Sequence, residues 1–401
     1  MPDSSNQQSD QPRKKVLILG GYGTFGSRIA HRLANEPGLH LIIAGRDRFK
    51  AELFASRLHD HPSQESLQRA SAEGIQLDRN SADFANQINR LNVDLLIHCA
   101  GPFYGQDYGV AEACIAQACD YIDIAESAAF VCNIDSLDAS AREAGTTVIS
   151  GAGTLPALSS AVLAALTDQF SRIDGVSVHI SPARQIRDAH ATQRSGFDFL
   201  GDGFQRIENG QQQDTYSGNY LQRVPFGHPV GPRWVCDYEA PDQRLIPQHF
   251  PGLRSLQTTT GLQPAPLQFG LAACANIAHR QFPIQREALR KQMAKVGHWL
   301  ADHWPMRSAN GGMMMEIEGV LSDQESGRQG AGAVQWQILG LNGDGPWIPA
   351  APAAALARKL LIGGKHSAGA RPCWQQVSLN EILEELTPYS VVSMMEVEPQ
   401  G

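Results

Sequence analysis

The chain has 401 residues, 42% hydrophobic and 18% charged, so it is long enough for two domains and apolar enough to bury a large core. It has 33 Lys and Arg against 41 Asp and Glu and no basic run longer than residues 13–15, so we expect no nucleic-acid partner. Residues 1–12 are polar, unlike a secretory signal, and no apolar run approaches the ~18 residues that span a bilayer. We therefore expect a cytoplasmic protein with no membrane partner.

Cysteine and histidine usage argues against a metal site. None of the seven cysteines stands in a Cys-x-x-Cys pair, and Cys114 and Cys119 are too far apart for a zinc knuckle. His298 and His303 are spaced so that they leave one face of a predicted helix. We expect the cysteines to be small buried hydrophobes in a reducing compartment, and we expect no bound metal.

The first 150 residues alternate between short apolar runs and amphipathic stretches. A run such as residues 15–19, closed by Gly20-Gly21, is typical of a buried parallel strand. Repeated alternation of this kind predicts right-handed crossovers and a Rossmann-type doubly wound parallel sheet, in the α/β class. The predicted strands are residues 15–19, 39–44, 74–77, 93–99, 121–124 and 146–149, and the predicted helices are residues 25–33, 49–58, 84–91, 110–119 and 130–142.

Beyond residue 151 the pattern changes to short alternating segments rich in Gly and Pro. This composition predicts an α+β region with a mostly antiparallel sheet. Residues 158–170, 284–304, 351–361 and 379–386 are expected to be helical, residues 176–180 to be a strand, and residues 313–320 and 334–341 to pair as a hairpin. The predicted organisation is a disordered tail at 1–13, a nucleotide-binding domain at 14–153, a substrate and dimerisation domain at 154–350, and C-terminal helices at 351–401, for which packing on the first domain is one arrangement.

The motif Gly21-Tyr22-Gly23-Thr24-Phe25-Gly26 lies between the first predicted strand and the first predicted helix. In a dinucleotide-binding turn, the first glycine makes the tight turn, the second lets the backbone approach a pyrophosphate, and the third lets the helix pack closely on the strand. The N–H groups and dipole at the start of the helix then attract the phosphates. The alternative is a tight turn that binds nothing. It is less favoured because the turn opens a long alternation of predicted strands and helices.

The end of the second predicted strand indicates which dinucleotide binds. An NAD site carries an acidic residue there to bind the ribose 2′-hydroxyl, whereas this chain reads Arg46-Asp47. Arg46 is suited to bind a 2′-phosphate and to stack on adenine. Asp47 stands one position later and is expected to cap the next helix. We therefore predict NADP, with NAD as the less favoured cofactor.

Two further segments are expected near the reaction site, because ligands of doubly wound sheets lie beyond the carboxyl ends of the strands. Ala100-Gly101-Pro102-Phe103, after the fourth strand, is suited to lie against the ribose and nicotinamide. Asp123 and Glu126, which end and follow the fifth strand, are candidates for general acid/base catalysis, and Asp123 has the alternative role of tying loops together. His98 lies within a strand and is expected to be structural.

Several segments of the chain are similar in sequence to the bacterial saccharopine dehydrogenase-like proteins. The segments GPFYG and GDGPWIP are more specific than the glycine motif. The resemblance extends from about residue 15 to residue 386. The segments that carry it are residues 16–26, 44–47, 99–108 (CAGPFYGQDY), 111–123, 150–162 (SGAGTLPALSSAV), 343–356 (GDGPWIPAAPAAAL) and 369–373 (GARPC).

The resemblance implies an NAD(P)-binding Rossmann domain joined to an α+β domain that supplies the substrate cleft and the contacts of a homodimer. Named members of the wider group reduce imines or oxidise amines, and relatives in lipid pathways look like enoyl reductases. Close relatives often read Asp-Gly-Arg where this chain has Glu126-Ser127-Ala128. The loss of that arginine removes a cation that could clamp a carboxylate, which argues against an amino-acid substrate.

The sequence thus supports an NADP-dependent oxidoreductase that moves a hydride to or from a small-molecule substrate, with a C–N bond as the favoured target. The alternatives are an NADP-binding sensor or scaffold without turnover and a reductase of carbon–carbon double bonds. Asp123 or Glu126 is the expected acid/base, with Tyr121 and His190 as lesser candidates. Arg184, Arg187 and His190 are the expected substrate-binding residues, and Arg184 or Arg187 is expected to hold an anionic group of the substrate.

Overall fold

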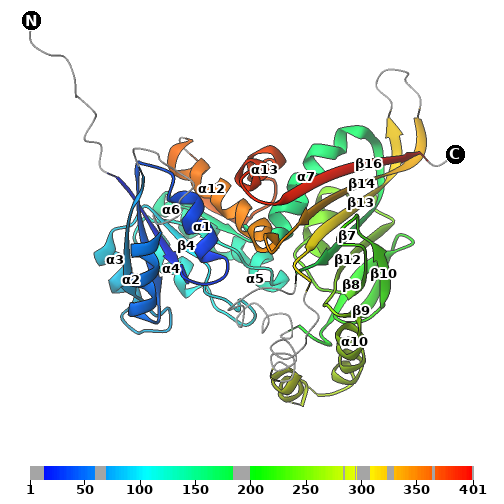
Figure 1. Ribbon diagram of the computed structural model, residues 1–401, viewed down its shortest axis with the longest axis horizontal. Helices are drawn as coiled ribbons and strands as arrows, with labels where there is room; N and C mark the ends of the chain where they lie inside the picture. The colour runs from blue at the N-terminus through cyan, green and yellow to red at the C-terminus, as the bar shows by residue number, and fades with distance from the viewer. Residues whose placement is uncertain are drawn as a thin grey trace, which may run out of the picture.

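The fold contains two β-sheets that lie side by side (Figure 1). The computed structural model describes residues 13–58, 69–183, 199–282, 285–293, 295, 308–322, 329–363 and 366–399. The chain builds most of the first sheet, then the second, and its last residues contribute to both. The prediction of a doubly wound parallel sheet followed by an α+β region with a mostly antiparallel sheet is confirmed.

The first sheet has seven strands in the order β15-β6-β5-β4-β1-β2-β3, and every pairing is parallel. The order reverses direction between β1 and β4, which is the switch point where open α/β sheets bind ligands. The strands are β1 (Lys14–Leu19), β2 (Leu39–Gly45), β3 (Ser71–Gln76), β4 (Leu95–His98), β5 (Asp120–Asp123), β6 (Thr147–Ser150) and β15 (Gly369–Pro372).

Helices cover both faces of this sheet, and the side chains of β1 show why. Val16 and Ile18 join one buried cluster with α1, whereas Leu17 and Leu19 join a second cluster with α4. Because successive strand residues point to opposite faces, a continuous apolar run needs cover on both sides. The helices of the first part of the chain are α1 (Gly26–Leu33), α2 (Arg48–Arg57), α3 (Phe84–Leu91), α4 (Gly109–Ile115), α5 (Ala128–Cys132) and α6 (Asp138–Ala144).

The second sheet has nine strands, seven of them in the order β10-β11-β12-β7-β13-β14-β16, with β8 and β9 attached at β12. Only β7 and β12 pair in parallel; the other pairings are antiparallel. The predicted hairpin is confirmed by β13 and β14. The strands are β7 (Phe170–Ser181), β8 (Gly203–Glu208), β9 (Gln211–Tyr216), β10 (Gln222–Pro225), β11 (Pro232–Asp237), β12 (Ser255–Thr260), β13 (Gly311–Ser322), β14 (Gln329–Gly340) and β16 (Val391–Pro399).

The helices of this part include two that the sequence pattern did not indicate, α9 (Asp242–His249) and α10 (Ala265–His279). The predicted helix at 158–170 is shorter, because α7 (Ser159–Leu166) passes into β7. Most of the predicted helix at 284–304 and the turn of the hairpin lie outside the described residues. No described helix is long and apolar enough to cross a membrane.

The end of the chain returns to the first sheet and then leaves it. Helix α12 (Ala351–Ile362) packs against α1 and the sheet, β15 extends the sheet, and α13 (Leu379–Leu386) leads to β16 of the second sheet. The buried carboxylate of Glu385 on α13 binds Arg32 of α1 at 2.6 Å and Arg358 of α12. This charge-assisted bridge therefore fastens three helices from distant parts of the chain.

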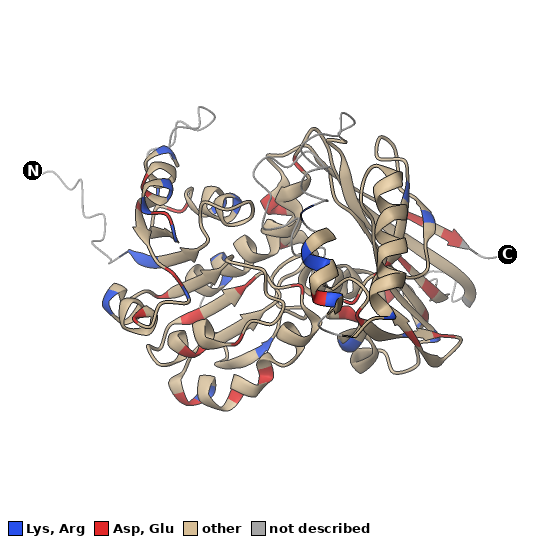
Figure 2. Cartoon of the chain, turned by 90° about the horizontal axis from the view of Figure 1, so that it is seen from below, with Lys and Arg blue, Asp and Glu red and all other residues tan. Residues whose placement is uncertain are grey.

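Charged residues are dispersed over both halves, and Figure 2 shows Lys and Arg interspersed with Asp and Glu. All seven cysteines are free, and none of them is exposed. Four of them are buried, as expected for small hydrophobes in packed interiors.

Candidate functional site

The loop from β1 to α1 is shaped by glycines that leave no room for a side chain. A Cβ atom at Gly21 would lie 2.8 Å from the Ile18 carbonyl oxygen, and one at Gly26 would clash with the carbonyl of Gly20. Gly20 itself takes φ +81°, a left-handed conformation that favours glycine. At Gly23 the nearest atom to a Cβ would be a single carbonyl oxygen at 3.0 Å. The first and third glycines of the motif, together with Gly20, therefore serve the close packing of strand, turn and helix.

Helix α1 begins without a side-chain cap. Phe25 precedes the helix, and its side chain accepts no hydrogen bond from the first turn. The first N–H groups of a helix have no intrahelical acceptor. In α1 the Ser27 N–H donates to the Gly23 carbonyl at 3.0 Å, which leaves the other N–H groups of the first turn for an anion. This uncapped start beside the glycine turn fits the pyrophosphate of a dinucleotide.

Tyr22 connects this loop to the end of β2. Its ring lies where a side chain on Gly45 would be, and its hydroxyl accepts a 3.0 Å hydrogen bond from the Asp47 N–H. Asp47 caps α2 by accepting from the Lys50 N–H at 3.1 Å, so the predicted cap is confirmed. Arg46 is exposed at this strand end. Its position beside the glycine loop suits a residue that binds a 2′-phosphate.

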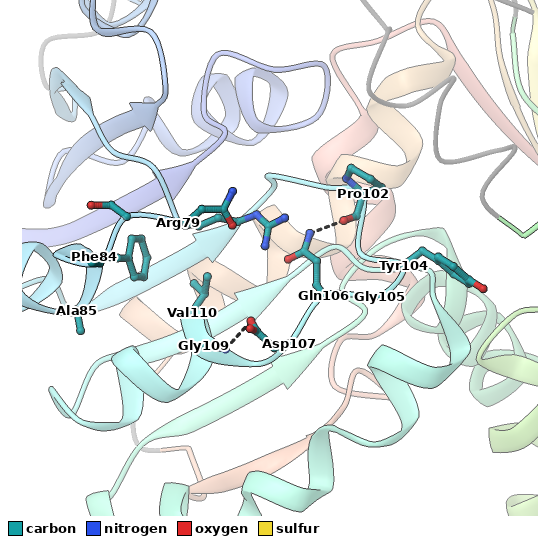
Figure 3. Close-up of a pocket in the computed structure, with 13 residues that line it drawn as sticks. Arg79, Phe84, Ala85, Pro102, Tyr104, Gly105, Gln106, Asp107, Gly109 and Val110 are labelled. Carbon is teal, nitrogen blue, oxygen red and sulfur yellow. Dashed lines mark hydrogen bonds between the residues drawn. The ribbon is translucent and has the colours of Figure 1, made fainter. Parts of the chain in front are cut away.

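A cavity of about 650 Å³ lies between the segments that follow β3 and β4 (Figure 3). Arg79 enters it from the first segment and Pro102 and Gln106 line it from the second, with Val110 of α4 behind them. This space lies next to the switch point, on the side of the sheet where the adenosine half of a dinucleotide binds. Arg79 is a second cation at this edge that the motif analysis missed.

Gln106 and His98 hold the Ala100-Gly101-Pro102 turn in place through hydrogen bonds to its backbone. The Gln106 amide donates to the Ala100 carbonyl at 3.2 Å and to the Pro102 carbonyl. His98 accepts from the Ala100 N–H at 3.2 Å and has its other ring nitrogen 3.3 Å from the Gln106 carbonyl oxygen. Burial lowers the pKa of His98 to about 3, so the ring is neutral at physiological pH. The predicted structural role of His98 is confirmed.

Asp123 is fully buried at the carboxyl end of β5. Its Oδ1 atom accepts from the Ala125 N–H at 2.9 Å, the Ser150 hydroxyl at 3.0 Å and the Gly151 N–H at 2.8 Å. Burial raises its pKa to about 6, and these donors together with Tyr121 oppose the rise. Of the two roles that the sequence leaves open, this geometry favours tying the ends of β5 and β6 together.

Glu126 lies three residues further on, at the boundary between the two sheets. The next residue, Ser127, caps α5 by accepting from the Phe130 N–H. Burial raises the pKa of Glu126 to about 7, the charge of Asp242 adds to the rise, and the Tyr238 hydroxyl opposes it. The carboxyl group of Glu126 is therefore poised to gain or lose a proton near neutral pH.

The two groups that shift the pKa of Glu126 come from the second part of the chain. Tyr238 follows β11, and Asp242 begins α9, which packs against α5. Asp242 is fully buried, and at hydrogen-bonding geometry neither of its carboxyl oxygens has a partner among the described residues. Burial raises its pKa to about 7, although the nearby Ser159 hydroxyl opposes the rise. We name Glu126, Tyr238 and Asp242 the carboxyl cluster.

Aromatic rings connect the Gly-Pro turn to this cluster. The Tyr104 hydroxyl, just after the turn, donates to Asp202 at 2.8 Å, and Asp202 also binds Arg286 at 3.0 Å. The Tyr104 ring packs edge-on against Phe199 at 5.1 Å, and Phe199 packs against Tyr238 at 5.6 Å. The two halves therefore meet where the first sheet presents its strand ends.

The structure separates the predicted site residues into three groups. The glycine loop, the β2 end and the Gly-Pro turn lie along one edge of the first sheet, with Glu126 at its boundary with the second. Asp123 and Tyr121 are buried behind that edge. The predicted substrate residues Arg184, Arg187 and His190 lie outside the described residues. No group of three or more His, Cys, Asp or Glu among the described residues is placed to hold a metal ion.

The sequence pattern did not lead to four residues of this site, which are Gly20, Arg79, Tyr238 and Asp242. The pair Gly20-Gly21 was a usable signal for Gly20, because a glycine pair after a strand marks a turn that needs an unusual conformation. Arg79 follows a predicted strand, as Arg46 does, and the same argument applies to it. Tyr238 and Asp242 have no local signal, since only the fold brings them to Glu126.

Comparison with known proteins supports these assignments at the level of family and fold. Residues 16–149 match the model of the saccharopine dehydrogenase NADP binding domain. No curated protein matches the chain. The fold is similar to that of apo saccharopine dehydrogenase (L-Glu forming) from Saccharomyces cerevisiae, with 13% identity over 96% of this chain and 99% of that one and a TM-score of 0.63.

More distant similarity extends to a probable dehydrogenase from Thermotoga maritima, with 10% identity, 93% of each chain covered and a TM-score of 0.42. An oxidoreductase from Sinorhizobium meliloti has 12% identity over 94% of this chain and 95% of that one, with a TM-score of 0.40. Over residues 16–149 this match agrees with the resemblance stated from the sequence, and the description of the matched model as an NADP binding domain agrees with the predicted cofactor.

Proposed function

We propose that this chain, a saccharopine dehydrogenase-like NADP-dependent oxidoreductase by its domain at residues 16–149, transfers a hydride at a carbon–nitrogen bond of a small substrate. The observation that carries the proposal is the Glu126 carboxyl, which lies at the same sheet edge as the glycine loop and has a pKa raised to about 7. Reduction of an imine needs a proton at nitrogen as well as a hydride at carbon. A carboxyl group that titrates near neutral pH serves both directions of that exchange.

The residues present fit NADP. The glycine loop and the uncapped start of α1 would hold the pyrophosphate, and Arg46 would bind the 2′-phosphate. The cavity beside Arg79 would receive the adenosine half, and the Gly-Pro turn would lie against the nicotinamide half. When bound, the cofactor supplies or accepts the hydride, and the protein supplies orientation, proton exchange and shelter from water.

The other candidate acid/base residues take supporting roles in this proposal. Asp123 accepts three hydrogen bonds through one oxygen, so it would position the loop that carries Glu126. Burial and the Asp123 charge raise the pKa of Tyr121 well above its ordinary value, so its hydroxyl would stay protonated. Glu126 is the remaining candidate that faces the second part of the chain and would exchange the proton directly.

The substrate and assembly complete the proposal. Arg184, Arg187 or His190 would bind an anionic part of the substrate, since residues 126–128 carry no arginine. A homodimer in the cytoplasm is proposed from the family resemblance. Free cysteines fit a reducing compartment, and the apolar side chains exposed on the edge strand β16 fit a subunit contact. Sedimentation at micromolar concentration would separate a dimer from a monomer.

Calorimetric titration with NADPH and NADH tests the cofactor part of the proposal. NADPH should bind more tightly than NADH, and Arg46→Ala should weaken NADPH binding about 10-fold or more, because a charge-assisted contact is lost. Arg57→Ala, at an exposed residue at the far end of α2, is the matched control and should leave both affinities unchanged. Equal binding of the two cofactors by the parent protein would contradict the choice of Arg46.

The substrate part is tested by turnover. Paired panels of amines with carbonyl compounds, and of enoyl compounds, are incubated with NADPH while its oxidation is followed. Oxidation with imine-forming pairs supports the proposal. Oxidation with enoyl compounds alone would replace it by reduction of carbon–carbon double bonds, and tight NADPH binding with no oxidation in either panel would favour a sensor.

A further inference from the structure

Arg28 joins the glycine loop to a distant segment of the chain. It lies in the first turn of α1, and its Nη1 atom donates a hydrogen bond to the Thr24 carbonyl of the loop. Its guanidinium group lies over the ring of Trp347, with the Cζ atom 5.4 Å from the ring centroid. We propose that Arg28 is a positioning residue for the cofactor, and that Trp347 acts through it on the affinity of the loop for NADPH and NADH. The inference rests on the cofactor part of the proposed function and deepens it.

The hydrogen bond of Arg28 reaches the part of the loop that the glycines confine least. Close backbone contacts confine the glycines at the two ends of the loop, whereas a Cβ atom at Gly23 would meet a single carbonyl oxygen, at 3.0 Å. The next carbonyl, that of Thr24, accepts from the Arg28 side chain and from the Ser27 hydroxyl at 3.4 Å. A charge-assisted hydrogen bond is roughly twice as strong as a neutral one, so Arg28 is the stronger of the two donors.

The guanidinium group of Arg28 depends on an aromatic face. Arg28 is half-buried, and its Nε atom has no hydrogen-bond partner among the described residues. Burial lowers the pKa of Arg28, and the charge of Asp344 opposes this change. A guanidinium within about 6 Å of a ring centroid is attracted by the ring, and the attraction is stronger where water is excluded. The Trp347 ring therefore stabilises the cation in the position from which it reaches Thr24.

The second sheet holds the Trp347 ring in place. Trp347 belongs to the short helical turn η4 (Gly345–Ala350), which follows β14 and packs against α1. Its ring stacks on that of Tyr389, with centroids 3.7 Å apart and planes 15° apart. We name Trp347 and Tyr389 the aromatic pair. The Ser390 N–H, just before β16, donates to Asp344 at 2.8 Å. The ends of β14 and β16 are thus joined beneath the residue that holds Arg28.

Arg32 provides a comparison within the same helix. Its guanidinium group lies 5.9 Å from the centroid of the Tyr389 ring, so it approaches the same aromatic pair. Its hydrogen bond goes to the buried Glu385 carboxylate of α13 at 2.6 Å and not to the loop. Arg32 therefore fastens helices together, whereas Arg28 contacts both the aromatic pair and the loop. Cofactor affinity should depend on Arg28 and not on Arg32.

Calorimetric titration of the full chain with NADPH and NADH tests the inference. Arg28→Met should weaken the binding of both cofactors by a similar factor, about 5-fold, because it releases the loop that faces the pyrophosphate they share. Arg46→Ala should instead weaken NADPH selectively. Trp347→Leu keeps an apolar side chain but removes the aromatic face, so it should weaken both cofactors about 3-fold. Trp347→Phe retains a ring and should lie closer to the parent protein.

The double variant shows whether the two residues act together. If Trp347 acts through Arg28, the protein with Arg28→Met and Trp347→Leu should bind the cofactors as Arg28→Met alone does. Independent effects would multiply to about 15-fold. Arg32→Met is the matched control. It should lower stability but leave both affinities within about 2-fold, because Glu385 keeps Arg358 as a partner and the loop is untouched.

Denaturant unfolding of the same variants separates positioning from packing. A packing role alone would lower the free energy of unfolding and leave cofactor affinity unchanged. If the parent binds NADPH tightly and Arg28→Met and Trp347→Leu bind it equally well, the inference is refuted and the cofactor site stands. Multiplied losses in the double variant would also overturn it, because Trp347 would then act independently. If the parent binds neither cofactor, the proposed function and the inference both fail.

Discussion

The glycine loop and the carboxyl cluster are assembled from the chain in opposite ways. The loop uses consecutive residues from Gly20 to Gly26, and its shape follows from backbone contacts with the strand before it and the helix after it. The cluster uses Glu126 from the first part of the chain and Asp242 from the second, and burial is the largest cause of the raised pKa of each. In the proposed function, cofactor binding would thus depend on consecutive residues, and proton exchange on residues that the whole fold brings together.

The largest effect that separates the two regions is expected from Glu126→Gln. The amide keeps the shape and a hydrogen bond but cannot exchange a proton, so turnover should fall by roughly 10²–10⁴-fold. NADPH affinity should stay within about 2-fold, because the cofactor loop is untouched. Steady-state rates and calorimetric titration of the same preparation provide both values. Glu143→Gln, an exposed residue of α6 away from both regions, serves as the control for turnover.

The Glu126→Gln prediction would be contradicted if turnover survived and affinity fell. Glu126 would then belong to cofactor binding, and the division between the two regions would be wrong.

The glycine loop should show the reverse behaviour in Gly26→Ala. The added Cβ would clash with the Gly20 carbonyl and the Gly21 backbone, and neither can move without disturbing β1. We expect the free energy of unfolding to fall by roughly 3 kcal/mol and NADPH binding to weaken more than 10-fold. Denaturant unfolding and calorimetric titration measure these effects. Gly38→Ala, where no atom lies within 4 Å of the added Cβ, is the matched control and should change little.

The glycine loop and the elements beside it were predicted well from the sequence, because their signals come from residues that are close together in the chain. The apolar run that ends at Leu19, the glycines that follow and the Asp47 cap each act on residues only a few positions away. The sequence did not predict α9, since Pro247 and the short length of that helix resemble a loop. It missed β15 and β16 because each needs a distant partner strand, Thr147–Ser150 for one and Gln329–Gly340 for the other.

The residues of the candidate site also divide into those with a local sequence signal and those without one. Glu126 was named because it follows a strand of a doubly wound sheet, where ligands bind. Tyr238 and Asp242 were not named, because burial is what makes them important and burial is set by tertiary packing. Asp123 was given a catalytic role alongside a structural one, and only the three donors to its Oδ1 atom favour the structural role.

The pH dependence of the free energy of unfolding should reveal the cost of burying the Asp242 carboxyl group. The folded protein raises the pKa of Asp242 to about 7, so between its unfolded pKa and about pH 7 the folded state binds more protons. This contribution is fully present below the unfolded pKa and is lost as the pH rises through about 7. The free energy of unfolding should therefore fall more steeply from pH 5 to pH 8 in the parent than in Asp242→Asn, by on the order of 2 kcal/mol.

Urea unfolding of both proteins at the two pH values measures this difference. Asp214→Asn, an exposed carboxyl on β9, is the control and should follow the parent. Parallel pH profiles for the parent and Asp242→Asn would mean that Asp242 remains ionised in the folded state and that its burial has no electrostatic cost.

The smallest effect concerns the link between the two regions. Tyr104→Phe removes the 2.8 Å hydrogen bond from the loop after β4 to Asp202, which is still held by Arg286 and Arg290. A hydrogen bond between partly exposed groups contributes about 1 kcal/mol, so NADPH affinity and stability should change little. Turnover should fall about 3- to 10-fold, because the Gly-Pro turn is less firmly placed against Phe199 and the cluster beyond it.

Tyr108→Phe is the matched control for this link, since its hydroxyl bonds to the Phe130 carbonyl at 2.7 Å within the first part of the chain. It removes one tyrosine hydroxyl from the same loop without touching the second sheet, so it should lower stability by about 1 kcal/mol and leave turnover close to that of the parent. If the two variants lose turnover equally, the bond to Asp202 has no special role, and contact between the halves must depend on the aromatic packing of Tyr104 instead.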